Sequence, residues 1–122
     1  MTKPALSASC HCGAVTWSLD ERPGKLVRCN CSLCRRVGAL WAHAERAGAT
    51  FSYDPAKVVK YAYGDKTLAV VSCAACGNTT HYEGLGEYAD RCAVNANMAD
   101  PAELDGIPVK HFDGAESWEY LN

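Results

Sequence analysis

Large aliphatic side chains are scarce in this sequence of 122 residues. Isoleucine occurs once, phenylalanine twice, and only about a sixth of the residues are Leu, Ile, Val or Phe. Chains this poor in such residues often stay disordered, but a formal net charge of only −2 excludes a disordered polyelectrolyte. With so little material for a core, the fold needs a second source of stability, which bound metal or disulfide bonds can provide.

Long apolar segments are also missing. No run of about 18 apolar residues occurs, so we expect no contact with a membrane. Residues 1–7 lack the apolar stretch of a secretory signal. These two absences predict a cytoplasmic protein, whose thiols stay reduced and whose grouped cysteines bind metal or take part in catalysis.

Concentrated positive charge is absent too. The 12 Lys and Arg residues are scattered among 14 Asp and Glu residues, which argues against a nucleic-acid surface. We find no Ser-His-Asp or Cys-His arrangement, no paired carboxylates at a recognisable spacing and no phosphate-binding glycine loop. If the protein is an enzyme, its catalytic groups therefore belong to none of these motifs.

Cysteine, by contrast, is abundant, and seven of the eight cysteines fall into three short clusters. The clusters are Cys10-His11-Cys12-Gly13, Cys29-Asn30-Cys31-Ser32-Leu33-Cys34 and Cys73-Ala74-Ala75-Cys76-Gly77, while Cys92 stands alone. Residues two apart on a strand are about 6.6 Å apart, which suits a disulfide poorly. We therefore interpret the clusters as metal ligands.

The rest of the chain predicts one mainly β domain over residues 1–122, with one or two short helical turns. Extended segments are expected at 6–12 and 14–19, interpreted as one strand interrupted by a cysteine turn, and at 39–44, 50–53, 58–63, 67–72, 79–82, 88–97, 109–112 and 118–121. The segment 79–82 should pair back on 67–72 as a hairpin. Helical turns are expected at 33–38, closed by Gly38, and at 100–104, where Asp100 suits the N-cap and Pro101 the first position.

The outer pairs, Cys10 with Cys12 and Cys73 with Cys76, predict a structural zinc site. A glycine follows each pair and allows the tight turn that directs two thiolates toward one centre. Four thiolates form the closed tetrahedral shell of a structural zinc. Buried thiols without metal are the simpler alternative.

The central trio, which we define as Cys29, Cys31 and Cys34, has no fourth cysteine nearby. Three protein ligands with an open fourth position are typical of a catalytic zinc. Two alternatives stay open. Cys92 or one of three histidines (His43, His81 and His111) completes a closed site, or the first two cysteine clusters pair with each other.

An open site of this kind favours sulfur chemistry. Three thiolates leave zinc with a net charge of about −1, which makes it a weak activator of water but suits it to holding an incoming thiol as thiolate. Arg28, Arg35 and Arg36 flank the trio, and guanidinium groups pair with carboxylates in bidentate fashion. We take Arg35 as a substrate contact, and Asn95 as a second one that lines a cleft.

These residues resemble the glutathione-dependent formaldehyde-activating enzymes, a family that includes centromere protein V-like domains. The likeness spans roughly residues 7–113. It lies in Cys10-His11-Cys12-Gly13-Ala14-Val15, Cys29 to Arg36 with Gly38, Cys73 to Gly77, Val94-Asn95-Ala96, Asp100-Pro101 and Ile107 to Phe112.

The resemblance implies a β-tent fold, in which a zinc pins stacked antiparallel sheets. By this likeness Cys10, Cys12, Cys73 and Cys76 hold the structural zinc, and the trio holds the catalytic one. The implied activity is that of a carbon–sulfur lyase or synthase, which joins glutathione to formaldehyde to give S-hydroxymethylglutathione.

Two functions therefore compete. One is a zinc-dependent enzyme acting on a small thiol such as glutathione and a small aldehyde. The other is a zinc-stapled β binding module without catalytic activity. A homodimer with Trp41 or Trp118 on its face is a further expectation.

Overall fold

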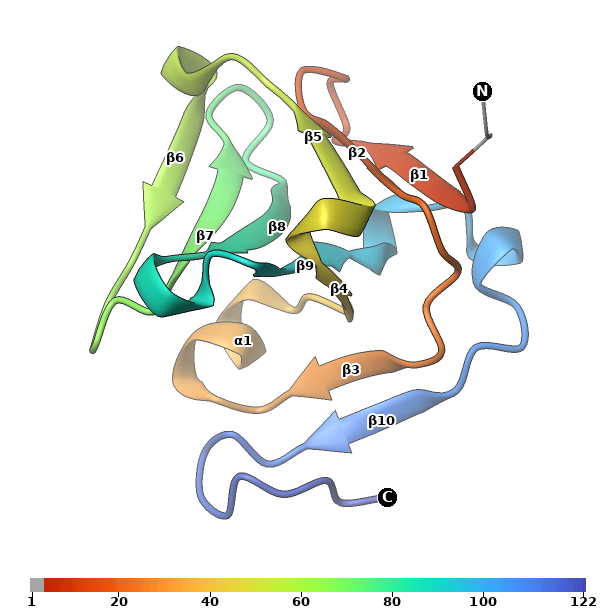
Figure 1. The fold of residues 1–122 in the computed structure, drawn as a ribbon, viewed down its shortest axis with the longest axis vertical. Helices are drawn as coiled ribbons and strands as arrows, with labels where there is room; N and C mark the ends of the chain where they lie inside the picture. The colour runs from red at the N-terminus through yellow and green to blue at the C-terminus, as the bar shows by residue number, and fades with distance from the viewer. Residues whose placement is uncertain (1–3) are drawn as a thin grey trace.

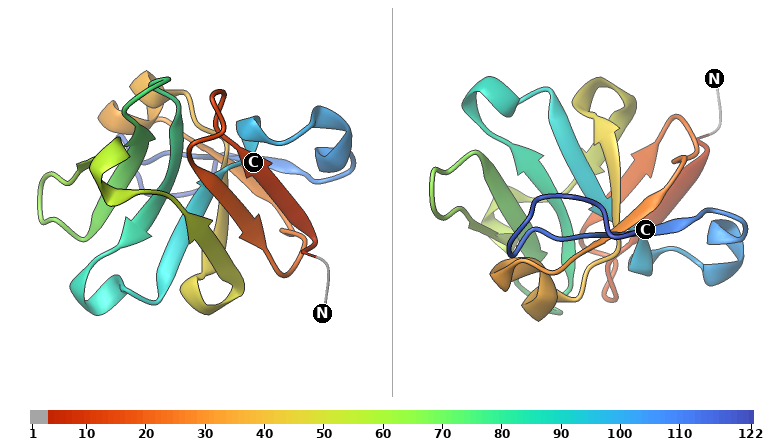
Figure 2. Two further views of the ribbon diagram at one scale, coloured as in Figure 1. Left: turned by 90° about the horizontal axis from the view of Figure 1, so that it is seen from above. Right: turned by 90° about the horizontal axis from the view of Figure 1, so that it is seen from below.

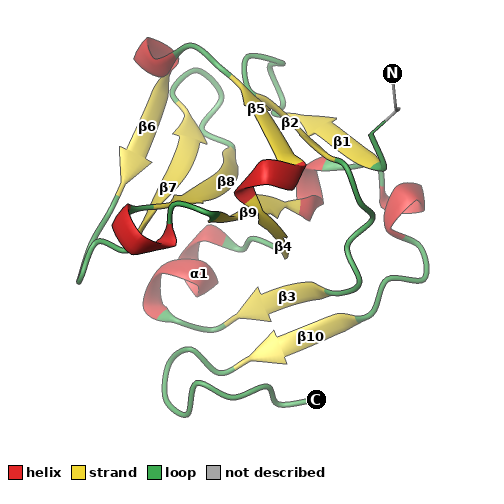
Figure 3. Ribbon diagram, viewed as in Figure 1, coloured by secondary structure: helices red, strands yellow, loops and turns green. Residues whose placement is uncertain are grey.

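The computed structural model describes residues 4–122, and the first three residues of the predicted domain lie outside the described part. Within that range the chain forms ten β-strands, one α-helix and five short 3₁₀ turns (Figures 1 and 3). The strands are β1 (Leu6–Ser9), β2 (Thr16–Leu19), β3 (Leu26–Cys29), β4 (Trp41–Glu45), β5 (Ala49–Ser52), β6 (Val58–Tyr61), β7 (Leu68–Cys73), β8 (Thr79–Gly84), β9 (Arg91–Asn95) and β10 (Val109–Phe112). Helix α1 covers Ser32–Val37, and the 3₁₀ turns cover Arg46–Gly48, Pro55–Lys57, Gly86–Tyr88, Ala96–Met98 and Pro101–Leu104.

The strands form two stacked sheets (Figure 2). The smaller sheet has the order β1-β2-β5, and the larger has the order β10-β3-β4-β9-β8-β7-β6. Among the described residues, neighbouring strands run antiparallel except for β10, which pairs in parallel with β3. The predicted mainly β fold of stacked antiparallel sheets is confirmed, with one parallel pair at an edge.

The main core lies between the two sheets. Trp17 and Leu19 of β2 are buried and pack in one cluster with Leu26 of β3 and Val94 of β9. Successive side chains on a strand point to opposite faces, so these inward residues of β2 alternate with partly exposed ones. The core is small because few large apolar residues are available to fill it.

The first predicted strand is wrong in one respect, because residues 6–19 form a hairpin. Strand β1 pairs antiparallel with β2, from Leu6 opposite Leu19 to Ser9 opposite Thr16. The cysteine run between them is the turn of this hairpin. A pattern of extended residues on both sides of a turn does not reveal whether the chain continues or reverses.

Strand β9 is shorter than the predicted 88–97, because 3₁₀ turns replace both of its ends. At its C-terminal end the side chain of Asn95 accepts the N–H of Asn97 at 3.2 Å. Local side-chain bonds of this kind compete with strand pairing. The predicted hairpin of 67–72 with 79–82 is confirmed by the antiparallel pairing of β7 and β8.

Both predicted helical turns are confirmed. Helix α1 ends at Gly38, whose N–H donates to the Cys34 carbonyl. The 3₁₀ turn at Pro101–Leu104 begins after Asp100, whose carboxylate accepts the N–H of Ala102 at 3.0 Å. In residues 4–122 the structure contains no helix with the length and apolarity that crossing a membrane requires.

A buried histidine ties β8 to the smaller sheet. His81 is fully buried, its Nε2 lies 2.9 Å from Glu83 Oε2, and its Nδ1 lies 2.8 Å from Thr80 Oγ1. Phe51 of β5 stacks on the imidazole with ring centroids 4.0 Å apart. Both ring nitrogens have partners, so His81 is part of the fold.

Glu83 is the acceptor at the centre of this cluster. Tyr53 Oη donates to Glu83 Oε2 at 2.6 Å, and Lys60 Nζ donates to Oε1 at 3.0 Å. The hydrogen bond from His81, opposed by burial but reinforced by those from Tyr53 and Lys60, lowers the pKa of Glu83 to about 2. The ionised carboxylate therefore stabilises the folded state.

We expect Glu83→Gln to lower the free energy of unfolding at pH 7 by on the order of 2–3 kcal/mol. Because the folded pKa lies below the ordinary value of about 4.3, the contribution is complete above about pH 4.3 and is lost as the pH falls towards 2. Urea unfolding of both proteins at pH 7, 4 and 3 checks this. A stability gap that does not narrow with falling pH would contradict it.

Candidate metal centres and the adjoining pocket

Four cysteines from two distant turns converge at one point. Cys10 and Cys12 lie in the turn between β1 and β2, Cys73 ends β7, and Cys76 lies in the β7–β8 turn. The Sγ atom of Cys12 lies 3.7 Å from that of Cys10 and 3.5 Å from that of Cys73, although 61 residues separate Cys12 and Cys73. All four sulfur atoms lie within 4.8 Å of one another. The alternative pairing of the first two cysteine clusters is therefore wrong.

The local backbone directs these sulfur atoms. Gly13 and Gly77 have φ angles of +85° and +76°, in the left-handed region that glycine enters most readily. Each lies directly after a cysteine pair and turns the chain there. The N–H of Val15 donates to Cys10 Sγ at 3.3 Å, and the backbone N–H of Asn78 lowers the pKa of Cys76 to about 6. These N–H groups favour the thiolate form.

The separations fit a tetrahedral zinc. With zinc–sulfur bonds of about 2.3 Å, neighbouring sulfur atoms of a tetrahedral shell lie about 3.8 Å apart. The two separations of 3.7 and 3.5 Å are close to this value. Four sulfur donors are also the ligand set of a closed structural zinc site. The residues present therefore fit this metal.

The central trio forms a second cluster around the start of α1. Cys29 ends β3, Cys31 is the N-cap of α1, and Cys34 lies in the helix. Cys31 Sγ accepts the N–H of Cys34 at 3.3 Å, and Trp41 Nε1 donates to Cys34 Sγ at 3.4 Å. The three sulfur atoms lie within 4.8 Å of one another and are half-buried. A three-thiolate set also fits zinc, with one position left for a further ligand.

The trio holds its protons unevenly. The hydrogen bond from Cys34 lowers the pKa of Cys29 to about 6, although burial opposes this shift. The backbone N–H groups of Cys31 and Gly114 lower the pKa of Cys29 as well. The same contact with Cys29, together with burial, raises the pKa of Cys34. Cys29 therefore loses its proton more readily than Cys34.

Within residues 4–122, no fourth Cys, His, Asp or Glu joins the trio. Cys92 is buried, and its thiol lies 3.5 Å from the Ala44 carbonyl. His81 is held by Thr80 and Glu83, and His43 and His111 are not part of the cluster. None of the four candidates proposed from the sequence closes this site.

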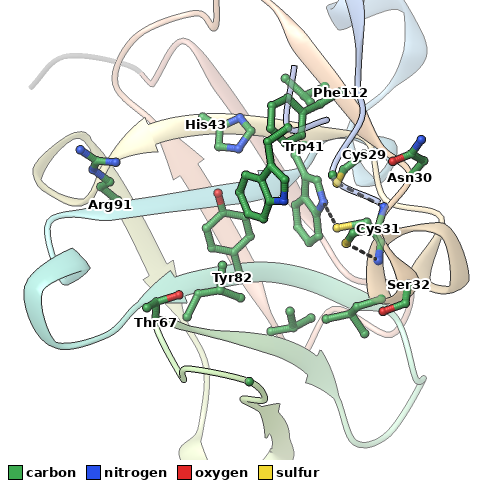
Figure 4. Close-up of a pocket in the computed structure, with 18 of the residues that line it drawn as sticks. Cys29, Asn30, Cys31, Ser32, Trp41, His43, Thr67, Tyr82, Arg91 and Phe112 are labelled. Carbon is green, nitrogen blue, oxygen red and sulfur yellow. Dashed lines mark hydrogen bonds between the residues drawn. The ribbon is translucent and has the colours of Figure 1, made fainter. Parts of the chain in front are cut away.

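The trio lines a cavity of about 1180 Å³. Trp41 of β4 and Tyr82 of β8 pack edge to face, with ring centroids 5.1 Å apart, and both border the cavity. Figure 4 shows Arg91 on the side of these two rings opposite to Cys29 and Cys31. Other lining aromatic residues are Tyr63, Phe112, Trp118 and Tyr120. The cavity is thus an aromatic chamber with thiols at one end and a guanidinium group at the other.

Of the two predicted substrate contacts, only Arg35 borders the cavity, where its side chain is exposed. Asn95 is 6% exposed, and its Oδ1 accepts the N–H groups of Leu40 and Asn97, both at 3.2 Å. Its Nδ2 donates to the Thr79 carbonyl at 2.8 Å. Because backbone groups hold both the oxygen and the nitrogen of this buried amide, the structure lends no support to Asn95 as a substrate contact.

The other two arginines beside the trio bind backbone instead. Arg36 donates to the Ser32 carbonyl at 2.7 Å, and Arg28 donates to that of Gly38 at 3.4 Å. Among the described residues neither is part of the cavity lining.

The aromatic part of the chamber was not predicted. Trp41 was expected on an exposed dimer face, but it is only 2% exposed and forms the cavity wall, so that prediction is wrong for Trp41. Tyr82, Gly114 and Trp118 also border the cavity. Their segments meet only through strand pairing and the course of the C-terminal chain, and no local motif marks them.

Comparison with known proteins gives a consistent result. The family described as "Glutathione-dependent formaldehyde-activating enzyme" matches residues 5–112. A crystal structure of a Rhodobacter sphaeroides protein, a structural genomics target, is 28% identical with a TM-score of 0.69, covering 85% of this chain and 99% of that one. Among curated proteins no significant match is found.

We expect Cys73→Ser to remove one zinc ion and to destabilise the protein by several kcal/mol, because structural zinc binding contributes folding energy directly. Native mass spectrometry should count one zinc instead of two, and thermal unfolding should move to lower temperature. The control is Cys92→Ala, which removes a buried thiol outside both clusters and should cost about 1 kcal/mol with both zinc ions kept. Equal zinc counts in the two variants would contradict the assignment.

We expect Gly114→Ala to weaken zinc binding at the trio about tenfold, as loss of a supporting contact to a ligand does. An added Cβ would lie 2.7 Å from Cys29 Sγ and 3.2 Å from Cys31 Cβ, so the thiol or the segment must move. Competition with a chromophoric chelator measures the loss. In the control Gly24→Ala the new Cβ meets nothing within 4 Å, and identical zinc affinity in both variants would contradict the prediction.

Proposed function

The chain belongs to the family of glutathione-dependent formaldehyde-activating enzymes, and from this membership we propose that it is a zinc-dependent carbon–sulfur lyase or synthase. Its substrates would be a glutathione-type thiol and a small aldehyde, and its product an S-hydroxymethylglutathione type of adduct. We propose two zinc sites, one structural and one in which the trio acts.

The observation that carries this proposal is the position of the trio. Three half-buried thiols converge at the wall of a cavity, and among residues 4–122 no fourth ligand joins them. The other cysteine cluster has four thiols, two of them fully buried, and suits a purely structural role. An incomplete ligand set beside a large cavity is what an exchangeable position requires.

Each residue of this site has a distinct role in the proposal. A zinc bound here would supply an electrophilic centre that favours the thiolate form of an incoming thiol. The trio provides the three ligands, and Trp41 holds Cys34 through its indole N–H. Arg35 would receive a carboxylate of the thiol substrate by bidentate pairing.

The reaction itself needs few groups. The substrate sulfur attacks the carbonyl carbon, one carbon–sulfur bond forms, and the thiol proton ends on the carbonyl oxygen. No atom leaves and nothing is oxidised or reduced. The reverse reaction releases the thiol and the aldehyde.

In this proposal residues 1–122 form a single zinc-binding β domain whose partners are small molecules. We expect neither nucleic acid nor a membrane as a partner. We also expect a cytoplasmic location. A homodimer stays a prediction, with Trp118 rather than Trp41 available on the surface.

Cys31→Ser tests the activity. Serine is a favoured N-cap, so this variant keeps the start of α1 while it removes one thiolate from the trio. We expect zinc at the trio to be lost and the exchange of ¹³C-formaldehyde with glutathione, followed by NMR, to fall at least about 100-fold, more than loss of a supporting contact causes. Leu121→Ala, at an exposed residue that is not among the cavity-lining residues, should keep the wild-type rate.

Formaldehyde exchange at the wild-type rate in the Cys31→Ser variant would contradict the proposed enzymatic activity. No exchange above the uncatalysed rate in the wild-type protein, with both zinc ions indifferent to added glutathione, would support the alternative of a zinc-stapled β binding module.

A further inference from the structure

The C-terminal segment 113–122 lies beyond residues 5–112, the part of the chain that the family shares. Nevertheless Gly114, Ala115, Trp118 and Tyr120 all border the cavity beside the trio. Figure 1 shows this segment turning back along β10, close to the side on which β3 leads into α1. This wall of the cavity is therefore formed by residues outside the matched range 5–112.

Specific contacts anchor the segment. Asn30, within the central cysteine cluster, uses both ends of its amide: Nδ2 donates to Asp113 Oδ1 at 3.0 Å, and Oδ1 accepts the N–H of Ala115 at 3.0 Å. At the other end Lys25 Nζ donates to Tyr120 Oη at 2.9 Å. The wall is held at a fixed position relative to the trio.

Trp118 is the unusual residue in this wall. Its φ angle of +58° lies in the left-handed region, where a bulky side chain is rare and strained. The backbone is held there because Trp118 N–H donates to the Asp113 carbonyl at 2.7 Å and Asp113 N–H donates to that of Glu119 at 2.8 Å. The indole packs edge to face on Phe112, yet the residue is 73% exposed. A strained backbone that presents a large apolar ring at a cavity suggests a binding role.

Further apolar surface borders the same cavity. Trp41 and Tyr82 are packed together, and Leu68 and Val70 of β7 also contribute. Formaldehyde, with one carbon, would leave these aromatic and aliphatic surfaces uncovered. Pockets for drug-sized ligands measure about 300–1000 Å³, and this cavity of about 1180 Å³ is larger. Thiol and aldehyde together must supply a sizeable apolar group.

We propose that the aldehyde substrate carries an aromatic or comparably bulky apolar group, which is bound between Trp118 and the Trp41–Tyr82 pair. This inference rests on the proposed function, keeps its thiol and its reaction, and replaces the small aldehyde by one with a larger apolar group. The step is R–SH + R′–CHO → R–S–CH(OH)–R′. The sulfur–carbon bond forms, the thiol proton moves to the carbonyl oxygen, and R′ contacts Trp118.

Product analogues test this subsite without any need for turnover. Isothermal titration of the full-length protein compares S-methylglutathione, whose sulfur bears one carbon, with S-benzylglutathione, whose sulfur bears an aromatic group. We expect the wild-type protein to bind the benzyl compound at least about tenfold more tightly, the scale of one aromatic contact and its buried surface.

Trp118→Gly removes the indole and accepts the positive φ angle without strain. We expect it to unfold within about 3 °C of the wild-type temperature while the benzyl preference falls about tenfold. Trp118→Phe keeps an aromatic ring and should retain most of the preference. The matched control is Leu121→Ala, since Leu121 is exposed in the same segment and is not among the cavity-lining residues.

Each result decides. A preference that Trp118→Gly abolishes and Leu121→Ala keeps supports the subsite. Equal affinity of the wild-type protein for the two compounds overturns the subsite, and so does a benzyl preference that is unchanged in Trp118→Gly. Both results leave the proposed function intact. If the wild-type protein binds neither compound nor glutathione, the proposed function fails and the subsite fails with it.

Discussion

The fold depends on the convergence of four thiols from turns about 60 residues apart. The main core contains few large side chains, and the smaller sheet packs on the larger through them. Around the four sulfur atoms lies a second small cluster with Val15, Tyr53, Val58 and Met98. A metal bound here would link the β1–β2 hairpin to the β7–β8 hairpin, one from each sheet. The short supply of apolar residues makes this link more important than in a domain with a large core.

The central trio also consists of cysteines, but its surroundings differ from those of the four-thiol cluster. Cys29 is held by β3, which pairs with β4 on one side and β10 on the other. Cys31 and Cys34 are held by the first turn of a six-residue helix. The frame around the trio is therefore rigid, but its sulfur atoms are only half-buried and face a cavity. Because Cys12 of the four-thiol cluster is exposed, the number of converging thiols and the adjoining cavity, rather than burial alone, distinguish the two clusters.

Local features of the fold could be predicted because short-range chemistry specifies them. Asp100 and Pro101 start a helical turn, Gly38 ends α1, and the cysteine pairs form tight turns before glycine. Predictions of chain direction and of distant partners were less successful, apart from the convergence of the two outer cysteine pairs. The chain reverses at residues 10–15 where one interrupted strand was expected. The Asn95 amide is occupied by backbone groups of three segments, which no spacing rule indicates.

By itself, the sequence determined which cysteines form turns and where glycine allows them, since spacing within a few residues fixes where neighbouring side chains can point. It also established the mainly β character through the alternation of apolar residues. Only the tertiary structure decided that the trio has no fourth ligand among the described residues, that Trp41 and Tyr82 meet, and that residues 113–122 close against Cys29. Those contacts join segments far apart in the chain, and their positions follow from strand order and packing, which local patterns do not encode.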